Sequence, residues 1–291
     1  RGLDARRPER WVVTVSHGGL GLPEREYYRR GDGQFPAIRE AYGAYIARVL
    51  SLAGQSSAQA RAQTILALET QIAERHWPIA DRRQRDRLYN LHDRVQLRAI
   101  APGFPWDAGL EAAGLGAADE VVVRELSAMG PLAALFMATP VSSWRDYLAF
   151  HVIDANCAVL PRPFDEAHFD FYGRTINGQP EPRERWKRAI DAVNSAMGEA
   201  VGELYVARHF PPEAKAQMLE LVENLRRAYG ERIDGLAWMS AETKVVAREK
   251  LAAFLPRIGY PDKWRDYSAL DVRAGDAYGN AKRAGQFAAA Y

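Results

Sequence analysis

The segment RWKRAIDAVNSAMGEAVGELYVARHF, residues 185–210, opens the stretch that decides the fold. Its apolar residues recur every three or four positions, which is the spacing of one face of an α-helix. They are Trp186, Ile190, Val193, Met197, Ala200, Val201, Leu204 and Tyr205. The pattern predicts a long helix over 183–205 with one buried face.

Two more helices are predicted before Trp264. One begins at Pro212, because proline suits the first turn of a helix, and its apolar residues are Leu219, Val222, Leu225, Tyr229, Ile233 and Leu236. The other has Ser240 as N-cap, and Gly259 ends it. Its predicted inward face consists of Ala247, Leu251, Phe254, Leu255 and Ile258. We expect four residues of the whole stretch to be core residues, namely Trp186, Leu204, Trp238 and Leu251.

Short motifs in these helices occur in a specific order. They are LYV (204–206), WM-x-x-x-TK (238–244), A-x-x-KL (247–251) and IGYPDKW (258–264), with GGLGLPEREYY (18–28) upstream. Together they resemble the neprilysin and endothelin-converting-enzyme family of zinc metallopeptidases, in the helix-rich region that precedes the catalytic domain. The resemblance runs from about Trp11 to Gly279. It implies a mainly α, multi-helix domain with a few short strands, the lid that forms the chamber of such a peptidase.

The same resemblance implies how the chain is organised. Residues 1–291 are expected to be one neprilysin-like N-terminal helical domain, incomplete at both ends, with the catalytic domain after 291. The lid would face that catalytic domain, its main partner, across a water-filled chamber and admit peptides while excluding folded proteins. The full-length enzyme would hydrolyse peptides on the amino side of hydrophobic residues.

Zinc chemistry in this family needs an HExxH motif and a downstream glutamate. None of the six histidines here begins that motif; they are His17, His76, His92, His151, His168 and His209. We therefore expect no catalytic, cofactor-binding or metal-binding residue in this chain. Zinc is expected only in the full-length enzyme, with its ligands beyond Tyr291.

Two clusters of possible metal ligands are weighed against that expectation. His151, Asp154 and Cys157 follow one another at steps of three, but three ligands on one helix span too far for tetrahedral zinc without a partner. A buried structural cysteine is favoured there. The other cluster is Asp165, Glu166, His168 and Asp170, in a segment over 164–178 that is predicted to be aromatic and turn-rich. Turn chemistry and helix capping account for these residues as well as a metal would.

The N-terminal part of the chain is also predicted to be mainly helical. Helices are expected over 35–53, 57–77 and 141–155, with short strands only near 12–15 and 121–123. The glycines after the first strand do not make a dinucleotide-binding loop, because Glu24 stands at the third glycine position. They predict a tight turn with a helix start at Pro23. Residues 102–106 are expected to form a loop with buried aromatic side chains, and 266–291 a loop with one weak helix.

Composition narrows the class of protein. The net charge is +2, with 47% hydrophobic and 26% charged residues, which is ordinary for a globular protein and gives no case for nucleic acid binding. Two aspartates stand among the four arginines of 81–87, which predicts a solvated helix face. No apolar run approaches the twenty residues of a membrane span. The chain opens on Arg1, so we expect its true N-terminus to be missing.

The single cysteine also bears on the source of the protein. Animal members of the family carry a disulfide-bonded cysteine near the position of Ala189, and only Cys157 is present here. Together with heavy use of alanine and arginine, this favours a bacterial member, periplasmic or secreted. The alternative interpretation is a stand-alone helical binding or scaffold module without protease activity. An HExxH motif in the downstream coding sequence would separate the two.

Overall fold

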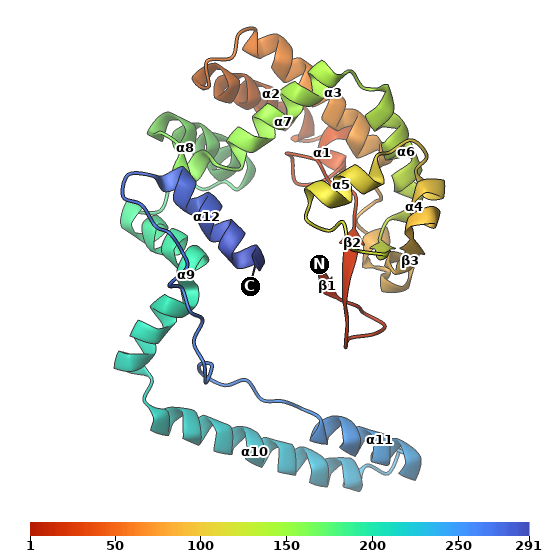
Figure 1. Ribbon diagram of the computed structural model, residues 1–291, viewed down its shortest axis with the longest axis vertical. Helices are drawn as coiled ribbons and strands as arrows, with labels where there is room; N and C mark the ends of the chain where they lie inside the picture. Colours follow the sequence, from red (N-terminus) through yellow and green to blue (C-terminus); the bar gives the residue numbers. More distant parts are fainter. Residues whose placement is uncertain (291) are drawn as a thin grey trace. The chain divides into compact units, whose positions relative to one another are not determined.

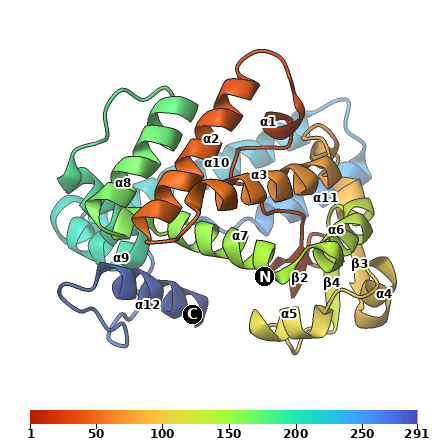
Figure 2. The same ribbon diagram turned by 90° about the horizontal axis from the view of Figure 1, so that it is seen from above.

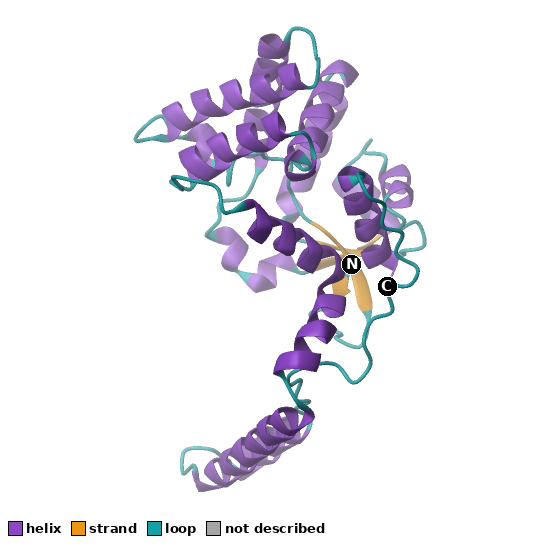
Figure 3. Ribbon diagram, turned by 90° about the vertical axis from the view of Figure 1, so that its left-hand side faces the viewer, coloured by secondary structure: helices purple, strands orange, loops and turns teal. Residues whose placement is uncertain are grey.

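The chain folds as two compact units in a computed structural model that describes residues 1–290 (Figure 1). The first unit is Arg1–Pro182 and the second is Arg183–Tyr291. Helices dominate both, and strands are few and short (Figure 3). The predicted mainly helical fold class is thus confirmed.

The helices of the first unit pack around two cores, an aromatic one and one on the small sheet. They are α1 (Glu26–Arg29), α2 (Phe35–Leu52), α3 (Ala58–Arg75), α4 (Arg94–Ile100), α5 (Trp106–Ala112), α6 (Leu126–Ala138), α7 (Val141–Asp154) and α8 (Arg162–His168), with a π-helix at Phe169–Ile176. The helices α2 and α3 pack side by side (Figure 2). Tyr42 and Ile46 of α2, Ile65 of α3 and Phe150 of α7 are fully buried between them. Their three-four spacing in the sequence is therefore the core-facing side of each helix.

A small sheet carries the second core of this unit. Its strand order is β1 (Gly2–Leu3), β2 (Trp11–Val15), β4 (Glu120–Val123) and β3 (Asn90–Asp93). β2 and β4 run parallel, with Val13 opposite Val121, while the other two pairs are antiparallel. Leu97 and Met129 pack on the buried valines. The strands predicted near 12–15 and 121–123 are confirmed, and β3 was not predicted.

Three segments of the first unit depart from the sequence prediction. Residues 164–176 are helical rather than turn-rich, because Pro161 and Pro163 occupy the N-cap and first turn of α8, where a missing N–H costs no hydrogen bond. The predicted loop at 102–106 leads directly into α5, and Phe104 and Trp106 are only half-buried. The segment 81–87 forms two 3₁₀ turns, Asp81–Arg83 and Arg85–Leu88.

The second unit contains α9 (Arg185–His209), α10 (Pro212–Gly235), α11 (Ala241–Ala252) and α12 (Ala277–Ala290). The predicted helices are present, and the Ser240 hydroxyl caps α11 by accepting from the Thr243 N–H. α9 is interrupted at Met197, whose backbone is not helical. α11 ends at Ala252 rather than at Ile258, because Pro256 excludes the residue before it from helical geometry.

The core prediction for the second unit is wrong. Trp186, Leu204 and Trp238 are 59%, 64% and 77% exposed, and Leu251 is only partly buried. No described residue of α9, α10 or α11 is buried. α10 packs on α11 and α9 on α12, and these pairs leave most of each apolar face accessible. Periodicity identifies an apolar face, but it does not identify what covers that face.

Two helices of the first unit have the length and composition of a membrane span only when they are taken together. Within residues 1–290, no single helix has both the length and the low charge that a span requires. α6 and α7 reach that threshold as a pair, across a bend of 111°.

Candidate functional site

The loop between β2 and α1, residues 16–25, contains the GGLGLP motif and lies against α2, α3 and α7. Gly19 has a φ of 93°, a conformation that side chains rarely adopt. A side chain at Gly21 would collide with the hydroxyl of the fully buried Tyr42. The tight turn predicted from these glycines is therefore confirmed, but the helix begins at Glu26 rather than at Pro23. The motif is needed for close packing of the loop on the helices.

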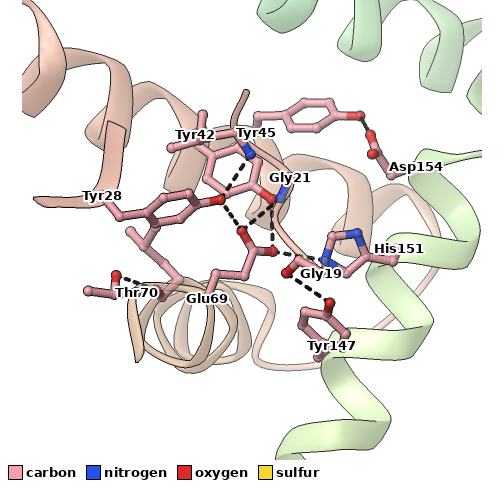
Figure 4. A network of polar contacts seen from close by, with 12 residues as sticks. Gly19, Gly21, Tyr28, Tyr42, Tyr45, Glu69, Thr70, Tyr147, His151 and Asp154 are labelled. Carbon is pink, nitrogen blue, oxygen red and sulfur yellow. Dashed lines mark hydrogen bonds and ion pairs between the residues drawn. The ribbon is translucent and has the colours of Figure 1, made fainter. Parts of the chain in front are cut away.

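A fully buried carboxylate, Glu69 of α3, is the centre of this packing (Figure 4). Its Oε2 accepts from the Tyr28 hydroxyl at 2.5 Å and from the Gly21 N–H at 3.2 Å. Its Oε1 accepts from the Tyr42 hydroxyl at 3.0 Å and lies 2.9 Å from Nε2 of His151. Four partners from four segments of the chain thus converge on one side chain, which compensates for its burial.

The tyrosines around Glu69 are held as hydrogen-bond donors. Burial raises the pKa of Tyr28 and Tyr42, and the charge of Glu69 raises both further. Two more tyrosines donate to the loop backbone: Tyr147 to the Gly19 carbonyl at 2.9 Å and Tyr172 to the Gly21 carbonyl at 3.0 Å. The loop is therefore fixed through both its N–H and its C=O groups.

A second buried carboxylate, Glu125, holds the other end of the loop. It accepts from the Ser16 hydroxyl at 2.7 Å, from the His17 N–H at 3.2 Å and from Nε of Arg82 at 2.9 Å. Burial alone would raise its pKa, but these partners hold the pKa of Glu125 below its ordinary value. Glu125 therefore stays charged and joins the loop to the segment that follows α3.

Two histidines stack beside Glu125, with the ring centroids of His17 and His76 3.8 Å apart. Nε2 of His17 accepts from the Trp77 N–H at 3.2 Å, and Nε2 of His76 lies 3.2 Å from the Gly18 carbonyl. Burial lowers the pKa of His17, and burial together with the neighbouring His17 lowers the pKa of His76 to about 4. Both rings are therefore neutral at pH 7.

These lowered pKa values predict that the first unit loses stability in mild acid. Between about pH 6.5 and 4 the unfolded chain binds protons that the folded His76 does not, so the free energy of unfolding falls as pH falls through this window. We expect a loss of about 1–3 kcal/mol between pH 7 and 4.5 by urea denaturation. Glu125 does not oppose the trend, because its lowered pKa delays its own protonation to more acidic conditions.

The control for this pH dependence is a variant without the titrating ring. His76→Gln should flatten the slope, whereas His209→Gln, on the exposed end of α9, should leave it unchanged. An unchanged slope in His76→Gln would contradict the assignment.

A cavity of about 260 Å³ opens beside the same loop. Aromatic side chains provide much of its wall, and they are Phe104, Trp106, Phe136, Trp144 and Tyr147. His17 and Met129 also line it. Nδ1 of His17 and Nε1 of Trp106 have no hydrogen-bond partner within residues 1–290, although both atoms are shielded from water. Side-chain nitrogens of Arg10, Arg25 and His92 in the first unit are buried without a hydrogen-bond partner among the described residues as well.

The first cluster of possible metal ligands, His151, Asp154 and Cys157, does not converge on a common point. α7 ends at Asp154, and Cys157 lies in the 3₁₀ turn Cys157–Val159 that follows it, so the three residues do not share one helix. His151 contacts Glu69, whereas Asp154 accepts from the Tyr45 hydroxyl. Cys157 is buried, as predicted, and burial raises the pKa of its thiol to about 11.

In the second cluster of possible metal ligands, Glu166, His168 and Asp170 each contact other partners. Glu166 pairs with Arg162 at 2.6 Å, and Asp170 pairs with Arg48 and Arg174 at 2.8 and 2.6 Å. His168 packs on Tyr172. Among residues 1–290 there is no group of three His, Cys, Asp or Glu side chains placed to hold a metal ion. The residues present therefore do not fit a zinc centre.

Glu69 and Glu125 were not identified from the sequence. The signal for Glu69 is its position, since it lies between Ile65 and Ile72 on the apolar stripe of α3. A charged residue on a stripe that is otherwise apolar indicates a buried polar network. Glu125 has no comparable signal, because it stands between a strand and a helix rather than within a periodic element.

Solved structures resemble the chain over most of its length. The zinc metalloprotease ZMP1 of Mycobacterium tuberculosis, in its open state, matches with a TM-score of 0.85 and 40% identity, over 94% of this chain and 43% of that one. PEPO from Lactobacillus rhamnosis matches with a TM-score of 0.75 over 94% of this chain and 45% of that one. At 20% identity, the second comparison supports the fold alone.

Sequence comparison adds further relatives. Human endothelin-converting enzyme-like 1 is 33% identical over 274 residues, which are 92% of this chain and 35% of that protein. Neprilysin-2 of Drosophila melanogaster is 28% identical over 296 residues, 93% of this chain and 38% of that protein. The chain thus spans well under half the length of these relatives. Residues 2–261 match the N-terminal family model described as "Peptidase family M13", and the chain belongs to that family.

Proposed function

We propose that this chain is the non-catalytic helical part of a zinc metalloendopeptidase whose full-length form hydrolyses peptide bonds. The observation that carries the proposal is the 40% identity to a zinc metalloprotease across 94% of the chain. The scattered histidines are consistent with it, because their ring nitrogens face separate partners such as Glu69 and the Gly18 carbonyl. The zinc ligands and the activated water would be supplied by the catalytic domain of the same protein.

The experiment compares the 291-residue chain with the full-length protein. A catalytic zinc needs three converging protein ligands and an open position, so the dialysed 291-residue chain should retain well under one zinc per molecule. It should also leave a fluorogenic peptide intact, while the full-length protein cleaves that peptide and loses the activity in a chelator. Chelator-sensitive cleavage by the 291-residue chain would overturn the proposal. A full-length protein without activity would favour a binding or scaffold module.

Within the full-length enzyme, we propose that the helical units cover the active-site chamber and restrict access to peptides. The first unit has the rigidity such a wall needs, since Glu69, Glu125 and the aromatic core fix its loop to the helices. The exposed apolar faces of α9, α10 and α11 suit contact with the rest of the protein.

Size selection by the full-length enzyme tests this lid role. A short peptide should be cleaved, and the same sequence held within a folded, protease-resistant domain should survive, because only a flexible peptide can enter a covered chamber. The unfolded form of that domain is the control and should be cleaved. Equal cleavage of the folded and unfolded forms would contradict access control.

We further propose that the protein acts on peptides in the periplasm or outside a bacterial cell. The proposal rests on the family resemblance and on the single buried cysteine, which needs no bridge to be stable in an oxidising compartment. Cell fractionation of the native host should recover the protein outside the cytoplasm; recovery with cytoplasmic markers would refute this location.

A further inference from the structure

Two histidines, His17 and His76, join the β2–α1 loop to the segment that follows α3 and form a histidine pair. Nε2 of His17 accepts from the Trp77 N–H at 3.2 Å, and Nε2 of His76 lies 3.2 Å from the Gly18 carbonyl. The rings stack with centroids 3.8 Å apart, and the two residues are only 9% and 7% exposed. Each side chain therefore binds the backbone beside the other histidine, so the two segments are held together reciprocally.

The two hydrogen bonds fix which nitrogen carries the proton in each ring. Nε2 of His17 must offer a lone pair, because the Trp77 N–H is a donor. Nε2 of His76 must donate, because the Gly18 carbonyl can only accept. The proton of His17 is thus on Nδ1, which is buried and has no hydrogen-bond partner among the described residues. The closed pair therefore leaves one polar group of His17 unsatisfied, which is a cost of keeping it closed.

A second proton on either ring is incompatible with the closed pair. On His17 it would occupy Nε2, and a donor would then face the Trp77 N–H, which is also a donor. On His76 it would place a positive charge against a buried ring 3.8 Å away, in a site that shields it from water. Protonation of the pair therefore requires that the rings separate.

The charges around the pair do not remove this conflict. Glu125 favours a proton on either ring, but Arg82 donates to that carboxylate at 2.9 Å and its own charge disfavours the proton. The guanidinium of Arg25 donates to the His76 carbonyl. The charged groups that face the pair from the loop, the 3₁₀ turn and the end of β4 are Glu24, Arg25, Arg82, Arg124 and Glu125. Three cations thus oppose two carboxylates.

We propose that the histidine pair is an acid-sensitive fastening, which closes the β2–α1 loop onto the segment after α3 at neutral pH and releases it in mild acid. Release frees the Trp77 N–H and brings Nδ1 of His17 into water, where its N–H finds an acceptor. Gly21, at the other end of the loop, stays bound, because its partners Glu69 and Tyr172 are not part of the pair. The release is therefore a local event, distinct from unfolding of the whole unit.

Acid favours the released form because burial holds the pKa of both rings below the ordinary value of 6.5. The released rings bind protons at a higher pH than the closed pair does. The population of the released form therefore rises as the pH falls below about 6.5.

Amide hydrogen exchange of the ¹⁵N-labelled 291-residue chain measures the release. The exchange rate of the Trp77 N–H, divided by its intrinsic rate at the same pH, should rise at least about tenfold between pH 7 and 5. Dilute urea should leave this rate unchanged, because a local opening exposes little surface, whereas exchange through global unfolding accelerates with urea. No rise in mild acid, or a rise that depends on urea, would overturn the proposal.

Variants of the pair test its part in the pH response. The double variant His17→Gln with His76→Gln keeps polar side chains and removes both titrating rings, so the normalised exchange of the Trp77 N–H should change less than about twofold between pH 7 and 5. His209→Gln, on the exposed end of α9, is the matched control and should keep the response of the parent chain. A folded double variant with the parent's response would refute the role of the pair.

Ring ¹⁵N shifts of the parent chain test the proposal without any substitution. At pH 7 they should report a proton on Nδ1 of His17 and on Nε2 of His76, as the two hydrogen bonds require. A proton on Nε2 of His17 at pH 7 would mean that the Trp77 N–H has no acceptor there, and it would overturn the proposal.

Discussion

Replacing Glu69 with alanine is expected to destabilise the first unit by about 3–5 kcal/mol. The substitution leaves the buried Tyr28 and Tyr42 hydroxyls without their acceptor. The Gly21 N–H and the His151 ring, which are partly buried, lose the same acceptor. Each unsatisfied donor adds a desolvation cost, and the lost side chain leaves a void. Urea denaturation at pH 7 measures the change.

The matched control is Glu74→Ala, five positions later in the same helix. The Glu74 side chain is 58% exposed, so its removal should change the free energy of unfolding by no more than about 0.5 kcal/mol. The loss of stability in Glu69→Gln should fall between these two values. An amide keeps one acceptor oxygen, but its NH₂ group would face side chains that are themselves hydrogen-bond donors. Equal stability of Glu69→Ala and Glu74→Ala would show that the buried network does not contribute to stability.

Truncating Phe150 to alanine is the second large effect, at about 3–5 kcal/mol. The ring is fully buried in α7 and meets the rings of Tyr42 and Tyr45 edge-on, at centroid distances of 6.1 and 5.9 Å. Its loss opens a cavity between α2 and α7 that rigid neighbours cannot fill. Thermal and urea unfolding of the variant both report the loss.

The control for Phe150→Ala is Trp238→Ala, which removes a side chain larger than phenylalanine. At 77% exposure, Trp238 has little contact area to lose, and the variant should stay within about 0.5 kcal/mol of the parent chain. A loss as large as that of Phe150→Ala would restore the sequence-based view of Trp238 as a core residue.

The helices that could be predicted from the sequence are those with one apolar face. α2 and α3 were located to within about two residues, because polar residues alternate with the apolar stripe at helical spacing. α6 was not identified, since the sequence LSAMGPLAALFMA is apolar on nearly every side and contains Pro131. A helix without a polar face has no periodicity to detect.

The candidate site was harder to predict than the helices because its parts are far apart in the sequence. Glu69 meets Tyr28 across 41 residues and His151 across 82. No local sequence pattern predicts such long-range contacts, because they depend on how α2, α3 and α7 pack. The exposure of the apolar faces of the second unit was missed for a related reason, since exposure depends on neighbours rather than on spacing.

The parallel pairing of β2 with β4 has a consequence for the order of folding. Val13 pairs with Val121, and the helices α2 and α3 lie between them in the chain. Local helical contacts form early. The pairing of β2 with β4 forms later, because closing the long loop between the two strands costs conformational entropy. During synthesis, the apolar strand WVVTV cannot find its central partner until Val123 has left the ribosome. Until then the edge of β2 that pairs with β4 is unpaired, and such an edge exposes a nascent chain to aggregation.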